Sequence, residues 1–161
     1  MSLVVRHKKM FKFLYKTGHK IQGKELGLEV IELFPGDDSK GYVPAYTLDI
    51  LLENKKIGHL NLRIGEDTNL KYYSGNIAYK IEEHFRGNSY AAKACDLAKE
   101  IFIKHGLNTI YITCNPDNFT SKRVCEKLGA DYLETVNVPA EHEIYQRGEK
   151  QKCRFEWRLN A

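Results

Sequence analysis

The sequence predicts an α/β (α+β) domain built on a mixed, mainly antiparallel central sheet. Apolar and polar side chains alternate in several segments between residues 26 and 82, a pattern typical of half-buried strands. Over residues 91–105 the apolar spacing changes to three and four, as in an amphipathic helix. A strand–helix–strand–helix core follows from the middle of the chain, and it implies one parallel strand pair inside the sheet.

Four strands are predicted before the first helix, over residues 26–33, 46–53, 57–64 and 75–82. The first is rich in apolar and β-branched residues and ends at the turn that begins with Pro35 and Gly36. Residues 54–56 turn the second strand into the third, so these two form a hairpin. The fourth strand alternates in the same way as the third.

The second half of the chain completes the order β-β-β-β-α-β-α-β-β. Gly106 follows the helix over 91–105, at the place where a left-handed C-cap is expected. A strand over 108–114 leads to a second helix, which Asp117 or Asn118 caps and Gly129 ends. The closing strands are predicted over residues 131–138 and 153–159.

Composition and length fit one globular domain. The chain has 161 residues, of which 42% are hydrophobic and 29% charged, and such values are typical of folded domains. The apolar runs are too short for a transmembrane helix, and the N-terminus lacks the apolar segment of a secretory signal. We therefore expect a cytoplasmic protein with no membrane partner.

Four widely spaced cysteines indicate thiols rather than a disulfide framework. Cys95, Cys114, Cys125 and Cys153 form no C-x-x-C pair, and a chain of this length needs no disulfide scaffold. We expect these side chains to be mostly buried as small apolar groups. No Cys or His pair has the spacing of a zinc finger, so no metal site is predicted.

The first 25 residues are predicted to form a basic arm, and residues 26–161 a single domain. Residues 1–24 carry seven Lys and Arg residues and no acidic residue, with aromatic side chains among them. This arm could contact nucleic acid, an anionic membrane surface or an acidic partner. The favoured interpretation is a solvated segment whose aromatic residues pack on the domain edge.

Residues 85–92 are predicted to carry the chemistry, because small residues stand where a strand passes into a helix. A helix start leaves backbone N–H groups unpaired and partly positive. Gly87, Ser89 and Ala91 would let a phosphate approach these groups, and Arg86 adds a fixed charge. The site suits a pyrophosphate. The alternative is that residues 87–89 are only a turn and an N-cap.

Residues 86–91, Arg-Gly-Asn-Ser-Tyr-Ala, resemble motif A of the GCN5-related N-acetyltransferases (GNAT), whose pattern is Gln/Arg-x-x-Gly-x-Gly/Ala. Ser89 replaces the middle glycine. Residues 118–130 are similar to the family segment Asn-x-x-Ser/Ala-x-x-x-x-Glu-Lys-x-Gly-Phe/Ala, in wording close to the branch of the ribosomal-protein acetyltransferases. The resemblance covers about residues 46–132.

The resemblance implies an acyltransferase that uses acetyl-CoA as its cosubstrate, bound where the fourth and fifth predicted strands splay apart. The phosphate, pantetheine and thioester parts would contact different residues. The implied cofactor-binding residues are Ile81, Glu82, Glu83, Arg86, Gly87, Asn88, Ser89, Tyr90, Ala91, Asn118 and Ser121. Lys122 or Arg123 could neutralise a phosphate, although a solvated helix charge is the favoured interpretation for both.

The implied reaction is direct attack of a primary amine on the thioester, with the oxyanion held by a backbone N–H of the fourth strand. Many members place a Tyr four residues after the Ser of the second motif as the acid; here Cys125 stands there, and Ser121 is the remaining catalytic candidate. His105 ends the first helix, where a positive charge is favourable. The base is open among Glu82, Glu83, His84, His59, Tyr79, Glu134, Glu141, His142 and Glu143.

The acceptor side departs from the family, because residues 34–45 hold no room for the two helices that often follow the first strand. Residues 10–20 could supply one such helix, or the site is open enough for a small molecule, a protein amine or the neighbour in a homodimer. An alternative function is a non-catalytic acyl-CoA-binding or regulatory module. A nucleic-acid-binding protein ranks below both, since the chain beyond the arm is net acidic.

Overall fold

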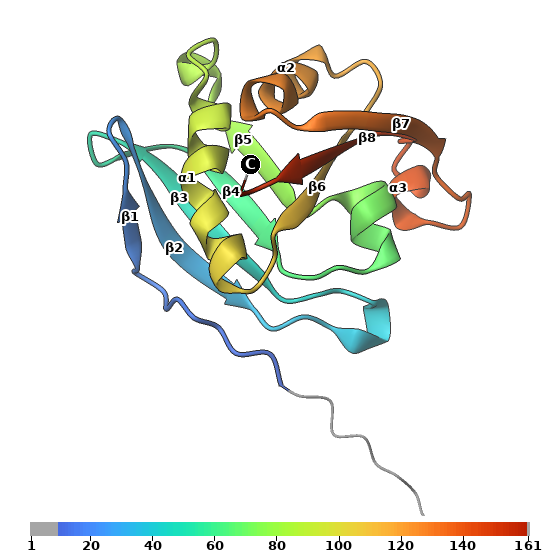
Figure 1. The fold of residues 1–161 in the computed structure, drawn as a ribbon, viewed down its shortest axis with the longest axis horizontal. Helices are drawn as coiled ribbons and strands as arrows, with labels where there is room; N and C mark the ends of the chain where they lie inside the picture. The colour runs from blue at the N-terminus through green and yellow to red at the C-terminus, as the bar shows by residue number, and fades with distance from the viewer. Residues whose placement is uncertain (1–9, 161) are drawn as a thin grey trace, which may run out of the picture.

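In the computed structural model, which describes residues 10–160, the strands form two antiparallel sheets (Figure 1). The larger sheet has the order β1 (Lys20–Gln22), β2 (Leu26–Phe34), β3 (Ala45–Leu52), β4 (Lys55–Arg63) and β5 (Ile77–Ile81). The smaller sheet has the order β6 (Thr109–Cys114), β8 (Gln151–Arg158) and β7 (Asp131–Asn137). The α/β class with a mainly antiparallel sheet is therefore confirmed.

Helices cover and connect the sheets. Helix α1 (Tyr90–Lys104) crosses one face of the larger sheet, and α2 (Phe119–Leu128) lies beside β6 and β8 (Figure 1). A short helix, α3 (Glu143–Gln146), precedes β8. A π-helical turn (Leu70–Ser74) stands before β5, and 3-10 turns occupy Asp38–Lys40 and Glu83–Phe85. The strand–helix–strand–helix core of the prediction is thus β5-α1-β6-α2.

The predicted parallel pair corresponds to β5 and β6, which meet at one end and then separate. The Asn76 N–H donates to the Tyr111 carbonyl at 2.7 Å. The Tyr111 N–H in turn donates to the side-chain Oδ1 of Asn76 at 2.9 Å. No ladder joins the two strands within residues 10–160, because a side chain takes the place of the next backbone acceptor. The parallel pair is therefore corrected to two neighbours that splay apart, as the family resemblance implied.

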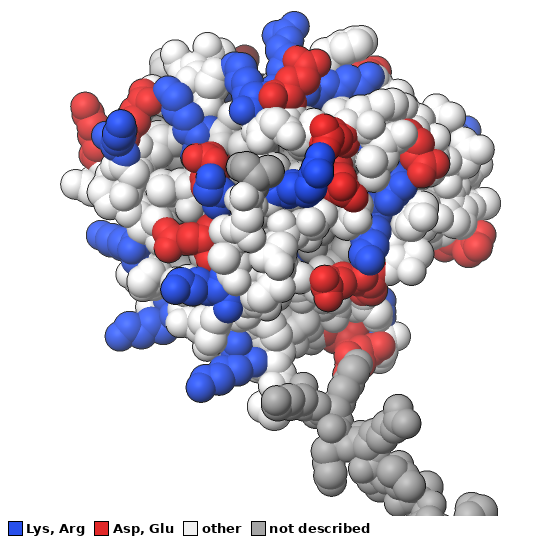
Figure 2. All heavy atoms as spheres, in the orientation of Figure 1, with Lys and Arg blue, Asp and Glu red and all other residues white. Residues whose placement is uncertain are grey.

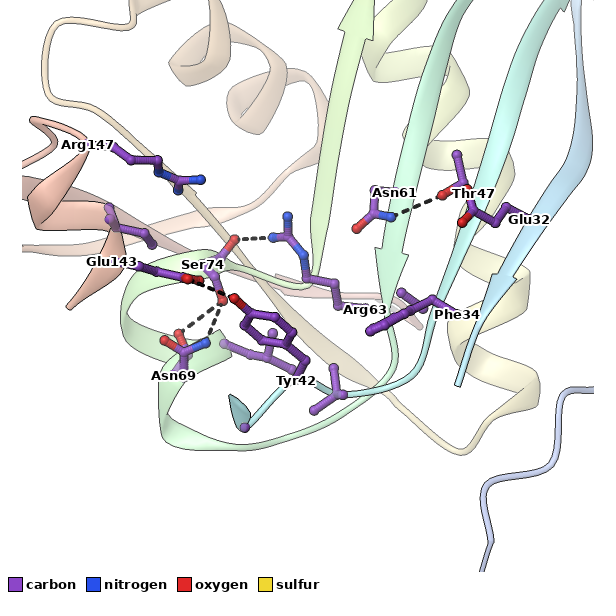
Figure 3. A pocket seen from close by; sticks show the side chains of 15 residues that line it. Glu32, Phe34, Tyr42, Thr47, Asn61, Arg63, Asn69, Ser74, Glu143 and Arg147 are labelled. Atoms are coloured by element: carbon purple, nitrogen blue, oxygen red, sulfur yellow. Dashed lines mark hydrogen bonds between the residues drawn. The ribbon is translucent and has the colours of Figure 1, made fainter. Parts of the chain in front are cut away.

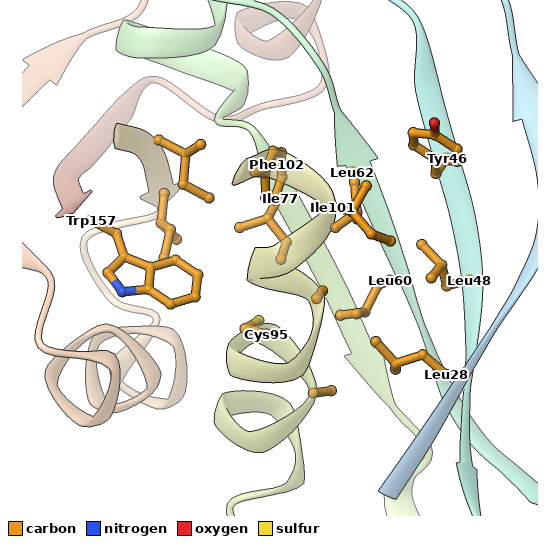
Figure 4. Packing of buried hydrophobic residues seen from close by; sticks show 14 of the residues in the cluster. Leu28, Tyr46, Leu48, Leu60, Leu62, Ile77, Cys95, Ile101, Phe102 and Trp157 are labelled. Atoms are coloured by element: carbon orange, nitrogen blue, oxygen red, sulfur yellow. The ribbon is translucent and has the colours of Figure 1, made fainter. Parts of the chain in front are cut away.

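The main core lies between α1 and the larger sheet (Figure 4). Small residues on α1, including Ala94 and Ala98, are fully buried and let the helix approach the strands closely. Leu48 and Leu60 from neighbouring strands, at 0% exposure, fill the space beneath it. The apolar residues predicted at spacings of three and four along this helix therefore form the face that contacts the sheet.

The described part of the arm packs against the domain. Phe11, Phe13 and Tyr15 contact the core, as the favoured interpretation predicted. The Leu14 N–H donates to the Tyr46 phenol at 3.0 Å, and residues 20–22 form the first strand of the sheet. No helix occurs in residues 10–19, so the expectation that this region supplies an acceptor-side helix is wrong. The remaining basic residues of the arm, Arg6, Lys8 and Lys9, lie outside the described residues.

The loop between β2 and β3 is short and contains only one 3-10 turn, as its Pro and Gly residues predicted. Asp37 caps this turn through its side chain, and Gly41 ends it with φ of 70°. All four cysteines are buried free thiols. No helix among the described residues is long and apolar enough to span a membrane. Basic and acidic side chains are interspersed on the face shown in Figure 2.

Candidate functional site

A cavity of about 500 Å³ opens where β5, α1 and α2 meet, and we name it the α1 cavity. Eight of the residues that the sequence singled out line it: Ile81, Arg86, Gly87, Ser89, Tyr90, Ala91, Asn118 and Ser121. They come from the end of β5, the loop before α1 and the start of α2. The fold therefore brings together two motifs that lie about thirty residues apart in the chain.

The start of α1 presents unpaired backbone donors to this cavity. The first N–H that bonds back along the helix is that of Lys93, to the Ser89 carbonyl at 3.1 Å. The N–H groups of Tyr90, Ala91 and Ala92 precede it and have no helical acceptor. Ser89 makes no capping hydrogen bond through its side chain, which instead accepts from Lys127 Nζ. The helix start is thus open to an anion and suits a pyrophosphate.

The loop before α1 has an unusual backbone, and this shapes the cradle. Gly87 has φ of 87° and Ser89 has φ of 62°, both in the left-handed region. At Ser89 this conformation costs about 1–2 kcal/mol, whereas the glycine of the family pattern adopts it freely. A Cβ on Gly87 would meet no atom within 4 Å, so the space over the loop is open to a ligand.

The cationic side chains that line the cavity come from α2, from β5 and from the loop before α1. Arg86 Nε donates to the Ile81 carbonyl at 2.9 Å, so this guanidinium fixes the end of β5. Arg123 lines the cavity, whereas Lys122 lies 5.2 Å from the Phe119 ring centroid. The sequence interpretation missed Lys127, which lines the cavity and contacts Ser89. Its spacing of four from Arg123 places both on one face of α2 and is the signal that could have found it.

Glu82, Glu83 and Asn88 are not brought to the cavity lining. The backbone carbonyls of Glu82 and Glu83 take part in the 3-10 turn. The Phe85 N–H donates to the Glu82 carbonyl at 2.9 Å, and the Arg86 N–H donates to the Glu83 carbonyl at 3.3 Å. Asn88 Nδ2 donates to the Phe85 carbonyl at 3.2 Å and is exposed. The part of β5 that lines the cavity instead includes Tyr79 and Lys80. β5 is the edge strand of the larger sheet. The edge of β5 that does not pair with β4 therefore faces the splay.

Ser121 lies at the wall between the two sides of the splay. Tyr79 Oη donates to Ser121 Oγ at 3.0 Å, and the Ser121 N–H donates to Asn118 Oδ1 at 3.1 Å. Burial raises the pKa of the Tyr79 phenol well above its ordinary value, so the hydroxyl stays protonated. Burial also raises the pKa of Cys125 to about 12, which keeps this thiol neutral.

Two further cavities continue from the splay. The splay cavity, of about 250 Å³, shares Tyr79, Asn118 and Ser121 with the α1 cavity, so the two meet at Ser121. The outer cavity, of about 360 Å³ (Figure 3), shares four residues with the splay cavity: Arg63, Ser74, Ile144 and Arg147. The three hollows are neighbours that extend from the start of α1 to the loop between β2 and β3.

Few of the candidate bases line these three cavities. Tyr79 lines the splay cavity and Glu143 the outer cavity. His142 caps α3, and Glu134 pairs with Arg154 at 2.7 Å. His59, Glu82, Glu83, His84 and Glu141 line none of the three cavities.

Glu149, which sequence reasoning missed, lines the splay cavity. Its carboxylate accepts from Lys152 Nζ at 2.8 Å. That hydrogen bond is the main cause of a pKa below the usual range of Glu, so the group is ionised at neutral pH. Glu149 precedes β8 in a segment that matches no family motif, so no pattern in the sequence marks it.

An open helix start with cationic side chains, beside a splay between two strands, defines a class of proteins that bind an acyl carrier through its pyrophosphate. The family description "acetyltransferase (GNAT) domain" matches residues 23–131. The chain therefore belongs to the GNAT family of acetyltransferases.

Solved structures share the fold at low sequence identity. RimL, a ribosomal L7/L12 alpha-N-protein acetyltransferase in complex with coenzyme A, superposes with a TM-score of 0.64 at 16% identity, covering 89% of this chain and 99% of that chain. RimJ of Mycobacterium smegmatis in complex with CoA-disulfide gives 0.63 at 12% identity, covering 89% and 88%.

A third structure is that of MccE, the microcin C7 self-immunity acetyltransferase in complex with acetyl-CoA and AMP. It gives a TM-score of 0.56 at 20% identity and covers 71% of this chain. The chain spans 61% of that protein. No curated protein matches the sequence.

Proposed function

We propose that the protein transfers the acetyl group of acetyl-CoA to a primary amine that enters through the splay cavity. The observation that carries this proposal is the shared wall at Tyr79 and Ser121, where the α1 cavity meets the splay cavity. A thioester at this wall would face an amine from the opposite side of the sheet. Donor and acceptor would then meet without a covalent enzyme intermediate.

The cofactor would lie along the α1 cavity. Backbone N–H groups of residues 87–91 would hold the pyrophosphate, with Lys127 and Arg123 beside it. Pantetheine would follow β5 past Ile81, and Asn118 would reach it from α2. Arg86 supports this arrangement by fixing the end of β5. The side chains of Glu82, Glu83 and Asn88 have no part in the proposed site, because these residues lie outside the cavity lining.

Ser121 would stabilise the departing thiolate. As the amine attacks, a C–N bond forms and the C–S bond breaks, and a backbone N–H of β5 would hold the oxyanion. An alkyl thiol with a pKa of about 8.5 needs only a weak proton donor near neutral pH. Because Ser121 Oγ accepts from Tyr79, its own hydroxyl proton is left to point at the sulfur. Tyr79 is therefore a positioning residue for Ser121.

Glu149 is our proposed acceptor, directly or through a water, of the proton that the substrate ammonium group loses to become the attacking amine. It is the only carboxylate among the residues that line the splay cavity. Its pKa, lowered first by the Lys152 hydrogen bond, keeps the carboxylate charged, and a charged carboxylate attracts the substrate ammonium group. This choice replaces the open list of candidate bases.

A non-catalytic acyl-CoA-binding module is the second candidate, and one observation favours it. Cys125 stands where the family often has a Tyr, and it is fully buried as a neutral thiol. Such a module would bind acetyl-CoA without turning it over. Release of free CoA in the presence of an amine discriminates between the two functions.

The first test is thermal unfolding with and without acetyl-CoA, for the wild type, Ala91→Glu and the control Ala140→Glu. A ligand at a hundredfold excess over its dissociation constant stabilises the native state by about 2.7 kcal/mol. We expect a shift in the wild type and the control but none in Ala91→Glu, because Ala91 lines the cavity and Ala140 is exposed elsewhere. A folded wild type with no shift would contradict the proposal.

A further inference from the structure

Two arginines converge where the splay cavity meets the outer cavity. Arg63 stands at the end of β4 and Arg147 follows α3, and both line both cavities. Figure 3 shows their guanidinium groups directed toward each other over Ser74. Since like charges repel, such an arrangement is favourable only when an anion lies between them.

Arg63 is held rigidly and lacks a carboxylate partner. Its Nη1 donates to the carbonyls of Ser74 at 2.6 Å and Gly75 at 3.2 Å. Within residues 10–160, its Nε and Nη2 donate no hydrogen bond, and no carboxylate pairs with it. Burial, and after it the charge of Arg147, lower the pKa of Arg63. A partly dehydrated cation with free donors is a built site for an anion.

The acidic residues nearby already have other partners or lie farther off. Glu143 accepts from the Tyr42 phenol at 2.7 Å, and its effect on Arg63 is weaker than that of Arg147. Glu149 forms ion pairs with Lys152 at 2.8 Å and, at the longer distance of 3.6 Å, with Arg147, so of the two arginines Arg63 is the one without a carboxylate partner among the described residues. Figure 3 places Glu32 at the opposite end of the outer cavity from Arg147.

We propose that Arg63 and Arg147 bind a carboxylate of the acceptor, so that the acceptor is a primary amine that also carries a carboxylate. This inference rests on the proposed function, since it uses the same splay cavity. Arg63 lines the cavity that Tyr79 and Ser121 also line, so one molecule can place its amine at the thioester and its carboxylate on the arginines. The planar guanidinium suits a carboxylate through paired hydrogen bonds.

Two sources of this chemistry are a free acidic amino acid and a peptide with an acidic side chain next to its amino terminus. The test measures CoA release with C-terminally amidated peptides Ser-Asp-Ala and Ser-Asn-Ala, and with free aspartate and asparagine amide. We expect kcat/KM roughly tenfold to a hundredfold higher for the acidic member of at least one pair. A preference within the peptide pair identifies a peptide as the acceptor, and a preference within the other pair identifies a free amino acid.

Arg147→Gln and Arg63→Lys test the residues, with Arg158→Gln as a matched control from the far end of β8. Arg147 is exposed by 66%, so its replacement should not disturb folding. We expect both variants to raise KM for the acidic acceptor about tenfold. The KM for the neutral acceptor and the thermal shift with acetyl-CoA should change little.

The outcomes separate the two proposals. Acetylation of acidic and neutral acceptors at equal rates overturns the carboxylate site and leaves the acetyltransferase proposal intact. If Arg147→Gln lowers kcat/KM equally for the acidic and the neutral acceptor, the site is also overturned, because a purely structural role of Arg147 would affect both acceptors alike. A wild type that acetylates no amine overturns the proposed function and this inference with it.

Discussion

The Tyr79 phenol on β5 donates a hydrogen bond to the Ser121 hydroxyl on α2, 3.0 Å away across the splay. This contact joins the two walls between which the thioester would lie. Cys125, on the same helix as Ser121, stands where the family often has a tyrosine. The phenol therefore comes from a strand rather than from the helix that carries the family motif.

The first prediction is that Tyr79→Phe lowers kcat about tenfold and leaves the KM for acetyl-CoA nearly unchanged. The aromatic ring still fills its space, and only the donor to Ser121 is lost. Ser121→Ala should lower kcat by about a hundredfold, the lower range for loss of a general acid. Steady-state kinetics of both variants measure these effects.

The double variant Tyr79→Phe/Ser121→Ala is the control for this contact. If Tyr79 acts only through Ser121, the double variant should be no slower than Ser121→Ala alone, because coupled residues are not additive. A full further tenfold loss would show that Tyr79 has a role independent of Ser121.

The second prediction is that Ser89→Gly stabilises the protein by about 0.5–1 kcal/mol. This gain is the relief of the left-handed backbone strain minus the conformational entropy that glycine loses on folding. Ser89 has φ of 62° and does not cap the helix with its side chain. Urea unfolding measures the change. Ser89→Ala is the matched control, because it removes the hydroxyl but keeps the strained backbone, and it should not stabilise. Equal stability of the two variants would argue against strain at this position.

The third prediction is that Lys127→Gln raises the dissociation constant of acetyl-CoA about tenfold to a hundredfold, as expected for one hydrogen bond to a charged group. Lys127 contacts Ser89 at the phosphate cradle. Lys122→Gln removes the same charge from the same helix at a position outside the cavity lining and should have little effect. Calorimetric titration with acetyl-CoA at two salt concentrations measures both. Equal effects of the two variants would show only a loss of net charge.

Local patterns in the sequence predicted the elements and the cofactor half of the site. The stripe of α1 predicted its buried face, and Gly106 and Gly129 have the left-handed φ values, 84° and 74°, that were expected after the two helices. Asn118 caps α2 through its side chain. These features depend on residues within a few positions of one another, and so periodicity and capping rules reveal them.

The acceptor half could not be predicted, because it joins segments far apart in the chain. Tyr42 and Glu143, which meet in the outer cavity, are 101 positions apart. No local pattern fixes such pairings, which depend on how β2, the π-helical turn and α3 pack together. Arg63 and Glu149 read as ordinary surface charges in the sequence for the same reason.

The last prediction concerns His105, whose role differs from the helix-end cation that the sequence suggested. Its Nε2 lies 2.7 Å from Tyr46 Oη, and the ring stacks on Phe11 with centroids 5.0 Å apart. Burial lowers the pKa of His105. The folded state therefore favours the neutral imidazole more strongly than the unfolded chain does.

The sign of the pH dependence follows from this shift. Below a pH of about 6.5, the unfolded chain binds a proton at His105 more readily than the folded protein, so stability falls as the pH falls through this range. His105→Gln should remove that part of the decline, and His59→Gln, at an exposed position on β4, should leave it in place. Urea unfolding of the three proteins between about pH 5 and pH 8 measures the slope. If the slope is unchanged in His105→Gln, other groups cause the acid sensitivity. His105 would then bind protons equally well in the folded and unfolded states.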